Sequence, residues 1–247
     1  MMAQLRSELL KQRSTRTNLG LLAGMLGLVL LAVFLHVYSI SVEDLGDPGG
    51  ANQLMILGRG EFLGALFAGL LGAMSITAEI RYGTIRPTFL VTPWRDRVVA
   101  AKVAASALFG AGFGLAASAL AAAAGIALLG ARGVDMQLDG GDYALLIAGG
   151  TAASALWAAI GVGVGAIVRN QVPALIGITA WLLFVEGLFG ENLIDIGRYA
   201  PGQLGMALSG QDPSTLLAPG VSAVLLALYA VAAAAIGLVA TIRRDVA

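Results

Sequence analysis

The sequence predicts an all-α integral membrane protein with six transmembrane helices, and three observations support this fold class. Hydrophobic residues make up 58% of the 247 residues, and the mean hydropathy is +0.85. Only 12% of the residues are charged, about half the share found in a soluble domain. The apolar residues also gather in runs long enough to cross about 30 Å of hydrocarbon, which takes about 20 residues. The composition therefore excludes a disordered chain, a nucleic-acid-binding protein and an ordinary water-soluble enzyme.

Six apolar runs are long enough to span a bilayer. The second is the shortest, because Glu61 and Glu79 bound it, and the fifth continues past Glu186. The last begins at Pro219, a residue suited to the first turn of a helix. The runs lack the alternation of polar and apolar residues that marks the strands of a membrane barrel. They cover residues 19–38, 62–78, 103–129, 143–168, 172–189 and 219–242.

The first 17 residues are predicted to form an interfacial helix. Leu5 and Leu9 lie one helical turn apart, and basic residues occupy much of the remaining surface. The alternative is a solvated basic tail that only sets topology. The apolar run after it is longer than that of a secretory signal, so we expect an uncleaved anchor rather than a cleaved leader.

The placement of charge predicts the orientation. The net charge is zero, yet twelve of the 15 lysines and arginines fall in the two termini and in the loops on the same side as the termini. Only Arg59, Arg132 and Arg198 fall on the other side. Because basic residues in short loops stay in the cytoplasm, both termini are expected there.

The loop between the second and third spans, residues 79–102, is the most patterned cytoplasmic segment. Gly83 can end the incoming helix, and Thr84 can cap a short helix with Pro87 in its first turn. Thr92 and Pro93 repeat a helix start signal. The expected order is helix, short cross-helix, helix. Its apolar residues favour a docking surface for another protein, with an interfacial helix on lipid headgroups as the alternative; they are Ile85, Phe89, Leu90 and Val91.

This segment resembles a known family. It matches, in order, the signature that follows the second span in type 2 ABC (ATP-binding-cassette) transporter permeases, with Glu79, Gly83, Thr84, Arg86, Pro93 and Lys102. Residues 167–177 (IVRNQVPALIG) resemble the family's link between spans four and five. Residues 198–203 (RYAPGQ) resemble its extracellular segment before span six. The likeness covers nearly the whole chain.

The resemblance implies that residues 79–102 contain a coupling helix, which sits in a groove of a separate ATPase subunit. Arg86 and Arg95 are then candidates for charge-assisted contacts to acidic ATPase residues. The full set of expected contact residues is Glu79, Gly83, Thr84, Ile85, Arg86, Pro87, Phe89, Pro93 and Arg95.

The chain offers little chemistry of its own. Neither of its two lysines lies in a G-K-[ST] sequence, so no phosphate-binding Walker A loop is expected. His36 is the only histidine and cysteine is absent, which argues against a metal site. We therefore expect no catalytic, cofactor or metal site, with ATP and Mg²⁺ on the partner ATPase. Glycine pairs four residues apart are instead expected to pack helices closely; they are Gly60/Gly64, Gly110/Gly114 and Gly161/Gly165.

A few polar residues near the outer side are candidates for the substrate path or an outer gate. Residues 190–218 are apolar yet extracellular, and Pro201 is expected within a re-entrant pair of short helices there. Glu186 is either a functional membrane carboxyl group or a wetted end of span five. Arg59 and Glu61 are expected at the rim of span two, where a long side chain can reach water.

Residues 1–247 are thus expected to form a single transmembrane domain, a multi-pass subunit of a bacterial cytoplasmic (inner or plasma) membrane. The expected function is that of an ABC exporter permease moving an amphipathic or hydrophobic substrate such as a drug, a lipid or a lipid-linked molecule. Expected partners are two ATPase subunits, a second permease subunit (identical or homologous) and membrane lipid, with no nucleic acid. The alternative is an ATP-independent membrane protein, such as a secondary transporter or an immunity or scaffold protein.

Overall fold

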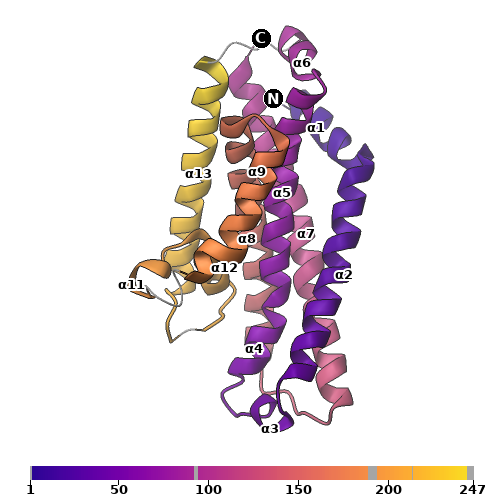
Figure 1. Cartoon of the computed structure of the whole chain (residues 1–247), viewed down its shortest axis with the longest axis vertical. Coiled ribbons are helices and arrows are strands. Elements are labelled where there is room, and N and C mark those ends of the chain that lie inside the picture. Colours follow the sequence, from indigo (N-terminus) through magenta and orange to yellow (C-terminus); the bar gives the residue numbers. More distant parts are fainter. Residues whose placement is uncertain (1, 92–93, 189–193, 213, 244–247) are drawn as a thin grey trace.

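The computed structural model describes residues 2–91, 94–188, 194–212 and 214–243 and is helical, with no strand in those ranges (Figure 1). Six helical stretches are long and apolar enough to cross a membrane, which confirms the expected number and the membrane-spanning class. These stretches are Arg16–Ser39, Ala51–Arg81, Arg95–Ala131, Gly140–Val168, Gln171–Leu188 and Pro219–Arg243.

Thirteen helical elements make up the described part of the chain. They are α1 (Met2–Ser14), α2 (Arg16–Ser39), α3 (Val42–Leu45), α4 (Ala51–Leu57), α5 (Arg59–Arg81), α6 (Ile85–Val91), α7 (Arg95–Ala131), α8 (Gly140–Val168), α9 (Gln171–Ala180), the π-helical stretch η1 (Trp181–Val185), α11 (Ile194–Gly197), α12 (Pro201–Leu208) and α13 (Pro219–Arg243).

The two ends of the bundle differ in what they carry. Helices α1 and α6 and the last turn of α13 lie at one end, called here the terminal end, and α6 stands at its tip (Figure 1). Helices α3 and α4 lie at the opposite, distal end. The first described helix, α1, and the end of the last, α13, therefore lie at the same end of the bundle.

Helices α5, α7 and α8 form the centre of the bundle, and small residues bring their backbones together. A Cβ atom added to Gly110 of α7 would lie 2.7 Å from the Ser154 carbonyl oxygen of α8. One added to Gly165 of α8 would lie 2.7 Å from the Ala73 carbonyl oxygen of α5. All three expected glycine pairs lie in these contacts. Hydrocarbon gives no hydrophobic reason for helices to associate, so close backbone approach is what stabilises them.

The second span is longer than the expected 62–78. α5 begins at Arg59, and the helical stretch that includes α4 covers 31 residues. The expectation was wrong because it ends the apolar run at Glu61. Glu61 is buried inside the bundle instead of lying at the rim. Its position shows that a carboxyl group can be held within a span by its neighbours.

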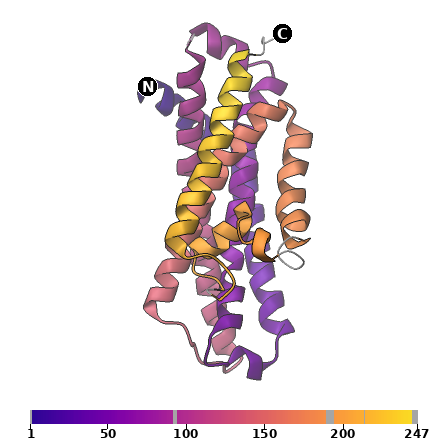
Figure 2. The same cartoon turned by 90° about the vertical axis from the view of Figure 1, so that its left-hand side faces the viewer.

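Two short helices, α11 and α12, precede the last span, as the sequence predicts for residues 190–218. Both views place them beside the long helices rather than beyond the distal tip at α3 (Figures 1 and 2). α12 packs against α8 and α13 and also contacts α5. Residues 189–193 and 213 of this segment lie outside the described residues.

Replacing Gly110 with alanine should destabilise the protein by about 1–3 kcal/mol, because the added methyl group meets the backbone of α8. The matched control is Gly112→Ala two residues away, where an added Cβ has nothing within 4 Å. Thermal unfolding of the purified protein in detergent measures both. Equal melting temperatures for the two variants would contradict the packing described here.

Candidate functional site at the terminal end

A single turn separates α6, the short helix at the tip of the terminal end, from α5. α5 ends at Arg81, and Gly83 follows with φ of +71°, a left-handed conformation that favours glycine. Thr84 immediately precedes α6, and Pro87 lies in its first turn. The expected break at Gly83 and the short helix after it are both present.

The exposed surface of α6 differs from the sequence-based expectation. Ile85 is buried and packs with Ile76 and Ala166, so it attaches α6 to the bundle instead of facing a partner. Leu90 is 83% exposed, and Pro87 is exposed as well. The side chains of Arg86 and Phe89, together with Thr92 and Pro93, lie outside what the structure describes.

The residues after α6 fasten α7 to the last span. An Nη1 group of Arg95 donates hydrogen bonds to the carbonyl oxygens of Thr241 (3.1 Å) and Ile242 (3.3 Å) in the last turn of α13. The arginine thus neutralises the carbonyl end of that helix. Arg95 was expected to reach an ATPase, whereas here it bonds within the chain. Trp94 is exposed, and its ring lies under the Arg97 guanidinium at 4.7 Å.

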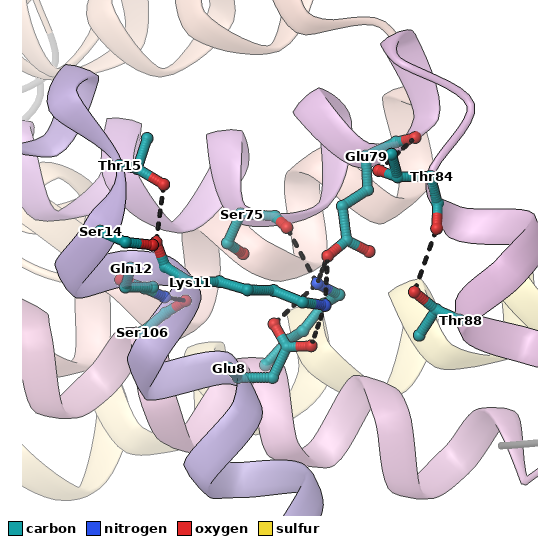
Figure 3. A network of polar contacts seen from close by, with 11 residues as sticks. Glu8, Lys11, Gln12, Ser14, Thr15, Ser75, Glu79, Thr84, Thr88 and Ser106 are labelled. Atoms are coloured by element: carbon teal, nitrogen blue, oxygen red, sulfur yellow. Dashed lines mark hydrogen bonds and ion pairs between the residues drawn. The ribbon is translucent and has the colours of Figure 1, made fainter. Parts of the chain in front are cut away.

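Four charged side chains join α1, α5 and α7 close to the turn that leads into α6 (Figure 3). The Glu79 Oε1 atom accepts from Lys11 Nζ at 2.8 Å and from Lys102 Nζ at 2.7 Å. The two carboxyl oxygens of Glu8 accept from the same two lysines, each at 2.8 Å. Both lysines of the chain are therefore used in one cluster, named here the ion cluster.

The interior of the ion cluster is buried. Lys102 is 1% exposed and Glu8 is 2% exposed. Besides the two glutamates, the Lys102 ammonium donates to the Ser75 carbonyl oxygen at 3.1 Å, so each of its three N–H groups has an acceptor. Removing one partner of such a cluster leaves an uncompensated buried charge, which costs about 3–5 kcal/mol.

Lys11 lies at the open side of the ion cluster. Its partial burial disfavours the charged form, but hydrogen bonds from its ammonium to Glu79 and Glu8 outweigh that effect and raise the pKa of Lys11 above 10.5. The stability it contributes is complete below pH 10.5 and is lost as the pH rises through the higher folded-state pKa. Lys11 is therefore charged at every physiological pH.

The face that α1 turns to the bundle is polar. Glu8 and Gln12 are its buried residues, and the Gln12 Nε2 group donates to Ser106 Oγ of α7 at 2.8 Å. The basic residues Arg6 and Arg13 are exposed, as an interfacial or solvated helix requires. Sequence reasoning missed Glu8 and Gln12, although the spacing of Glu8, Lys11 and Gln12 places all three on one helical face.

Towards the distal end, Glu186 holds α12 in place. Its Oε1 atom accepts hydrogen bonds from the Trp181 indole and from the Gly202 amide (2.9 Å), and its Oε2 atom accepts from the Gln203 amide (3.1 Å). The carboxyl group thus occupies the N-terminal end of α12, which begins at Pro201. Glu186 is buried, so its interpretation as a wetted end of span five is wrong.

Glu61 also lies against α12, beside Gly205, three residues after the Gly202 that Glu186 contacts. Its Oε2 atom accepts from Gln211 Nε2 at 3.4 Å, and the same amide donates to Ser209 Oγ at 2.7 Å. Arg59, two residues before Glu61 at the start of α5, is partly buried. The structure therefore brings Glu61, Glu186 and Pro201 together around α12. Gln211 escaped sequence reasoning, because its partner lies 150 residues away.

Within the described residues, no group of three or more His, Asp or Glu side chains is arranged to hold a metal ion. A scan against models of known protein families finds no match to this chain, and no curated protein matches its sequence significantly. The function of the chain must therefore be inferred from the geometry of its terminal and distal ends.

Lys102→Met should lower the free energy of unfolding by about 3–5 kcal/mol, because it leaves the buried Glu8 with only the partly exposed Lys11 as a cation. Glu8→Gln combined with Lys102→Met should recover part of that loss, since no unpaired charge then stays buried at this position. The control is Arg13→Met, because Arg13 is an exposed basic residue on α1, the helix that carries Glu8. This substitution should change the free energy of unfolding by less than about 0.5 kcal/mol. Denaturation in detergent checks all three. A double variant as unstable as the single one would show that the ion cluster is not the cause.

Glu186→Ala should loosen α12, because the Gly202 and Gln203 amides lose their acceptor. Hydrogen exchange of residues 201–208 should accelerate by about tenfold or more. Asp195→Ala removes an exposed carboxyl group from the neighbouring α11 and should leave that exchange unchanged. Unaltered exchange in Glu186→Ala would mean that packing alone holds α12.

Proposed function

We propose that this chain is the membrane-spanning permease subunit of an ABC exporter, driven by a separate ATPase subunit that docks on α6. The observation that carries the proposal is the position of α6. It stands at the tip of the terminal end, directly between the second and third long spans, and it presents Leu90 to the surroundings (Figure 1). A short helix with an exposed apolar residue and arginines nearby suits a protein partner.

The surroundings of α6 suit the transmission of motion. Ile85 attaches α6 to the bundle, Glu79 and Lys102 join the adjoining ends of α5 and α7, and Arg95 joins α7 to α13. A force applied to α6 would therefore act on three spans at once. Glu79 and Lys102 are also the first and last residues of the signature that resembles the type 2 permeases. Their ion pair at 2.7 Å is a physical reason for a glutamate and a lysine at the two ends of that signature.

The distribution of charge supports a cytoplasmic terminal end. Arg81 and Arg97 are exposed next to α6, and Arg6 and Arg13 are exposed on α1. Basic residues near short loops are retained on the cytoplasmic side. An ATPase, which works in the cytoplasm, would then meet α6, while α11 and α12 would lie within the outer leaflet as a re-entrant roof over the transport path.

In this proposal the exporter holds two permease subunits, identical or homologous, and two ATPases that bind ATP and Mg²⁺. ATP binding would close the ATPases and favour the conformation of the spans that they bind more tightly. The substrate would be amphipathic or hydrophobic, because the spans consist mainly of Ala, Gly, Leu and Val. Glu61 and Glu186 would act around α12 at the outer gate. The location would be the bacterial cytoplasmic membrane.

An ATP-independent secondary transporter is the second candidate, and the burial of Glu61 and Glu186 favours it. Carboxyl groups within a membrane are costly and often take part in transport. Both, however, have partners that connect them to α12, which accounts for their burial without a transported ion.

Leu90→Glu should reduce co-purification of an ATPase subunit from native membranes by about tenfold or more, because the new carboxylate would be desolvated in the contact. The leucine is exposed, so the fold should be unaffected. Arg86→Glu combined with Gly83→Pro should act in the same direction, since proline cannot adopt the φ of +71°.

The control is Val42→Glu, the same charge placed on an exposed apolar residue of α3 at the distal end. It should leave co-purification at the level of the unaltered protein. The absence of any bound ATPase, or equal binding by the Leu90 and Val42 variants, would refute the docking role of α6 and favour the ATP-independent candidate.

A further inference from the structure

A pocket of about 340 Å³, named here the arginine pocket, opens at the turn between α8 and α9. Only residues 169 and 170 lie between the two helices, and α9 then runs back along α5 (Figure 1). The pocket is within the size range of small-molecule sites. The docking role proposed for α6 does not use it. Its lining consists of Arg81, Arg169, Asn170, Gln171 and Val172.

The Arg81 side chain reaches from the last residue of α5 to the start of α9. Its Nη1 group donates a hydrogen bond to Gln171 Oε1 at 3.3 Å, which places the guanidinium at the wall of the arginine pocket. The Tyr82 ring lies 5.6 Å from the same guanidinium and restrains it further. A guanidinium has five N–H donors, so the bond to Gln171 leaves most of them for a ligand.

Arg169 occupies a backbone position that suits glycine better. Its φ is +57°, a left-handed conformation in which a Cβ atom is unfavourable. Its amide donates to the Gly165 carbonyl oxygen at 2.9 Å and so ends α8, a task that glycine performs without this cost. The turn therefore does not explain the arginine. A residue held in such a conformation suggests that its side chain has a function.

The charge of the arginine pocket is not compensated within the chain. None of its five lining residues is acidic, and neither guanidinium has a carboxylate partner in the part of the chain that the structure describes. The acidic residue nearest in sequence to Arg81 is Glu79, which pairs with Lys11 and Lys102. The ion cluster holds two glutamates and two lysines, so it leaves the charge of the arginines unchanged.

Phosphate is the anion that best suits these donors. Guanidinium groups bind phosphate oxygens through paired N–H···O bonds, and two positive charges at one pocket attract a group that neutralises both. The start of α9 adds little, because Asn170 Oδ1 already accepts from the Val172 amide at 3.2 Å. The two arginines are therefore the groups that would hold the ligand.

Apolar residues continue from the arginine pocket along α9. Val172 lines the pocket and is 59% exposed, and Ile176, about one helical turn further, is 62% exposed. Both lie in a stretch long and apolar enough to cross a membrane, so they face hydrocarbon there. A phosphate group occurs in anionic phospholipids and in soluble phosphate compounds alike. Only the lipid brings an acyl chain to these exposed residues, and they favour it for that reason.

We propose that the arginine pocket binds the phosphate of an anionic phospholipid, with Arg81 and Arg169 on the phosphate oxygens and an acyl chain along Val172 and Ile176. A lipid held in this way connects the end of α5 to the turn between α8 and α9, in addition to the single bond to Gln171. The site depends on the membrane-spanning fold and not on an ATPase. It can therefore fail while the docking role of α6 holds, and the reverse.

The first experiment compares lipids that share a phosphate and differ in net charge. Native mass spectrometry of the purified protein in detergent, titrated with dioleoyl-phosphatidylglycerol or dioleoyl-phosphatidylcholine, measures binding of each. Phosphatidylglycerol should bind about tenfold more tightly or better, because its phosphate charge is not cancelled by a choline cation. Equal binding of the two lipids would overturn the proposal.

Inorganic phosphate distinguishes the lipid from a soluble phosphate compound. It has the charge without an acyl chain, so it should not displace bound phosphatidylglycerol in the same titration. Displacement of the lipid by inorganic phosphate would assign the arginine pocket to a soluble phosphate and refute the lipid as its ligand.

The second experiment tests the residues with matched variants. Arg169→Gly removes one guanidinium and relieves the φ of +57°, so the melting temperature without lipid should be nearly unchanged. This variant and Arg81→Gln should each weaken phosphatidylglycerol binding about tenfold or more. Arg97→Gln is the control, because Arg97 is exposed, contacts Trp94 and does not line the pocket. It should weaken binding less than about threefold.

Equal weakening in all three variants would mean that the basic end attracts lipid without a defined site, against the proposal. Undiminished binding in Arg81→Gln combined with Arg169→Gly would refute it as well.

Discussion

The contact between Glu79 and Lys102 is the interaction on which the terminal end depends. It joins α5 to α7 at 2.7 Å on either side of α6, and it completes a cluster in which Glu8 brings α1 to the same point. Without these charges, burial of the polar face of α1 would cost free energy, because Glu8 would have no cation to pair with. With them, α1 has a defined position on the ends of the central helices, and Glu8, Lys11 and Glu79 line a pocket between α1 and α5. A buried cluster of this kind adds little net stability over an apolar one, but it permits few alternative arrangements.

The sequence was most informative where a physical requirement is local. Span number follows from the length of apolar runs, the break at Gly83 follows from its conformational freedom, and the glycine pairs predict close helix contacts. Predictions failed where an outcome depends on distant partners. Ile85 is buried against Ala166, which is 81 residues away, and the bond between Gln12 and Ser106 joins residues 94 positions apart. A local sequence pattern contains neither contact.

Charged residues mislead a sequence-based interpretation of this chain in one consistent way. An isolated carboxyl group is costly in hydrocarbon, which favours ending span two at Glu61 and makes a wetted position one of the two alternatives for Glu186. Each carboxyl group is instead supplied with donors by the segment that contains α12: the amides of Gly202 and Gln203 for Glu186, and the Gln211 side chain for Glu61. The two glutamates and the segment that contains α12 therefore satisfy each other's hydrogen-bonding groups. The short helix needs an acceptor at its N-terminal end, and the buried carboxyl groups need donors.

The α6 segment, proposed as the docking site, also lines a pocket of about 450 Å³ between α1 and α5, and this has a thermodynamic consequence. Thr84 and Thr88 belong to the α6 segment and also line the pocket beside the ion cluster. If a partner that grips α6 displaces it, the walls of the pocket move as well, and the affinity for any occupant changes. Linkage then requires the reverse effect of equal size, so an occupant would change the affinity of α6 for the partner by the same factor. Glu79, whose Oε1 atom joins α5 to α7 through Lys102, also lines this pocket, so a movement of α6 that disturbs the pocket would act next to the ion cluster.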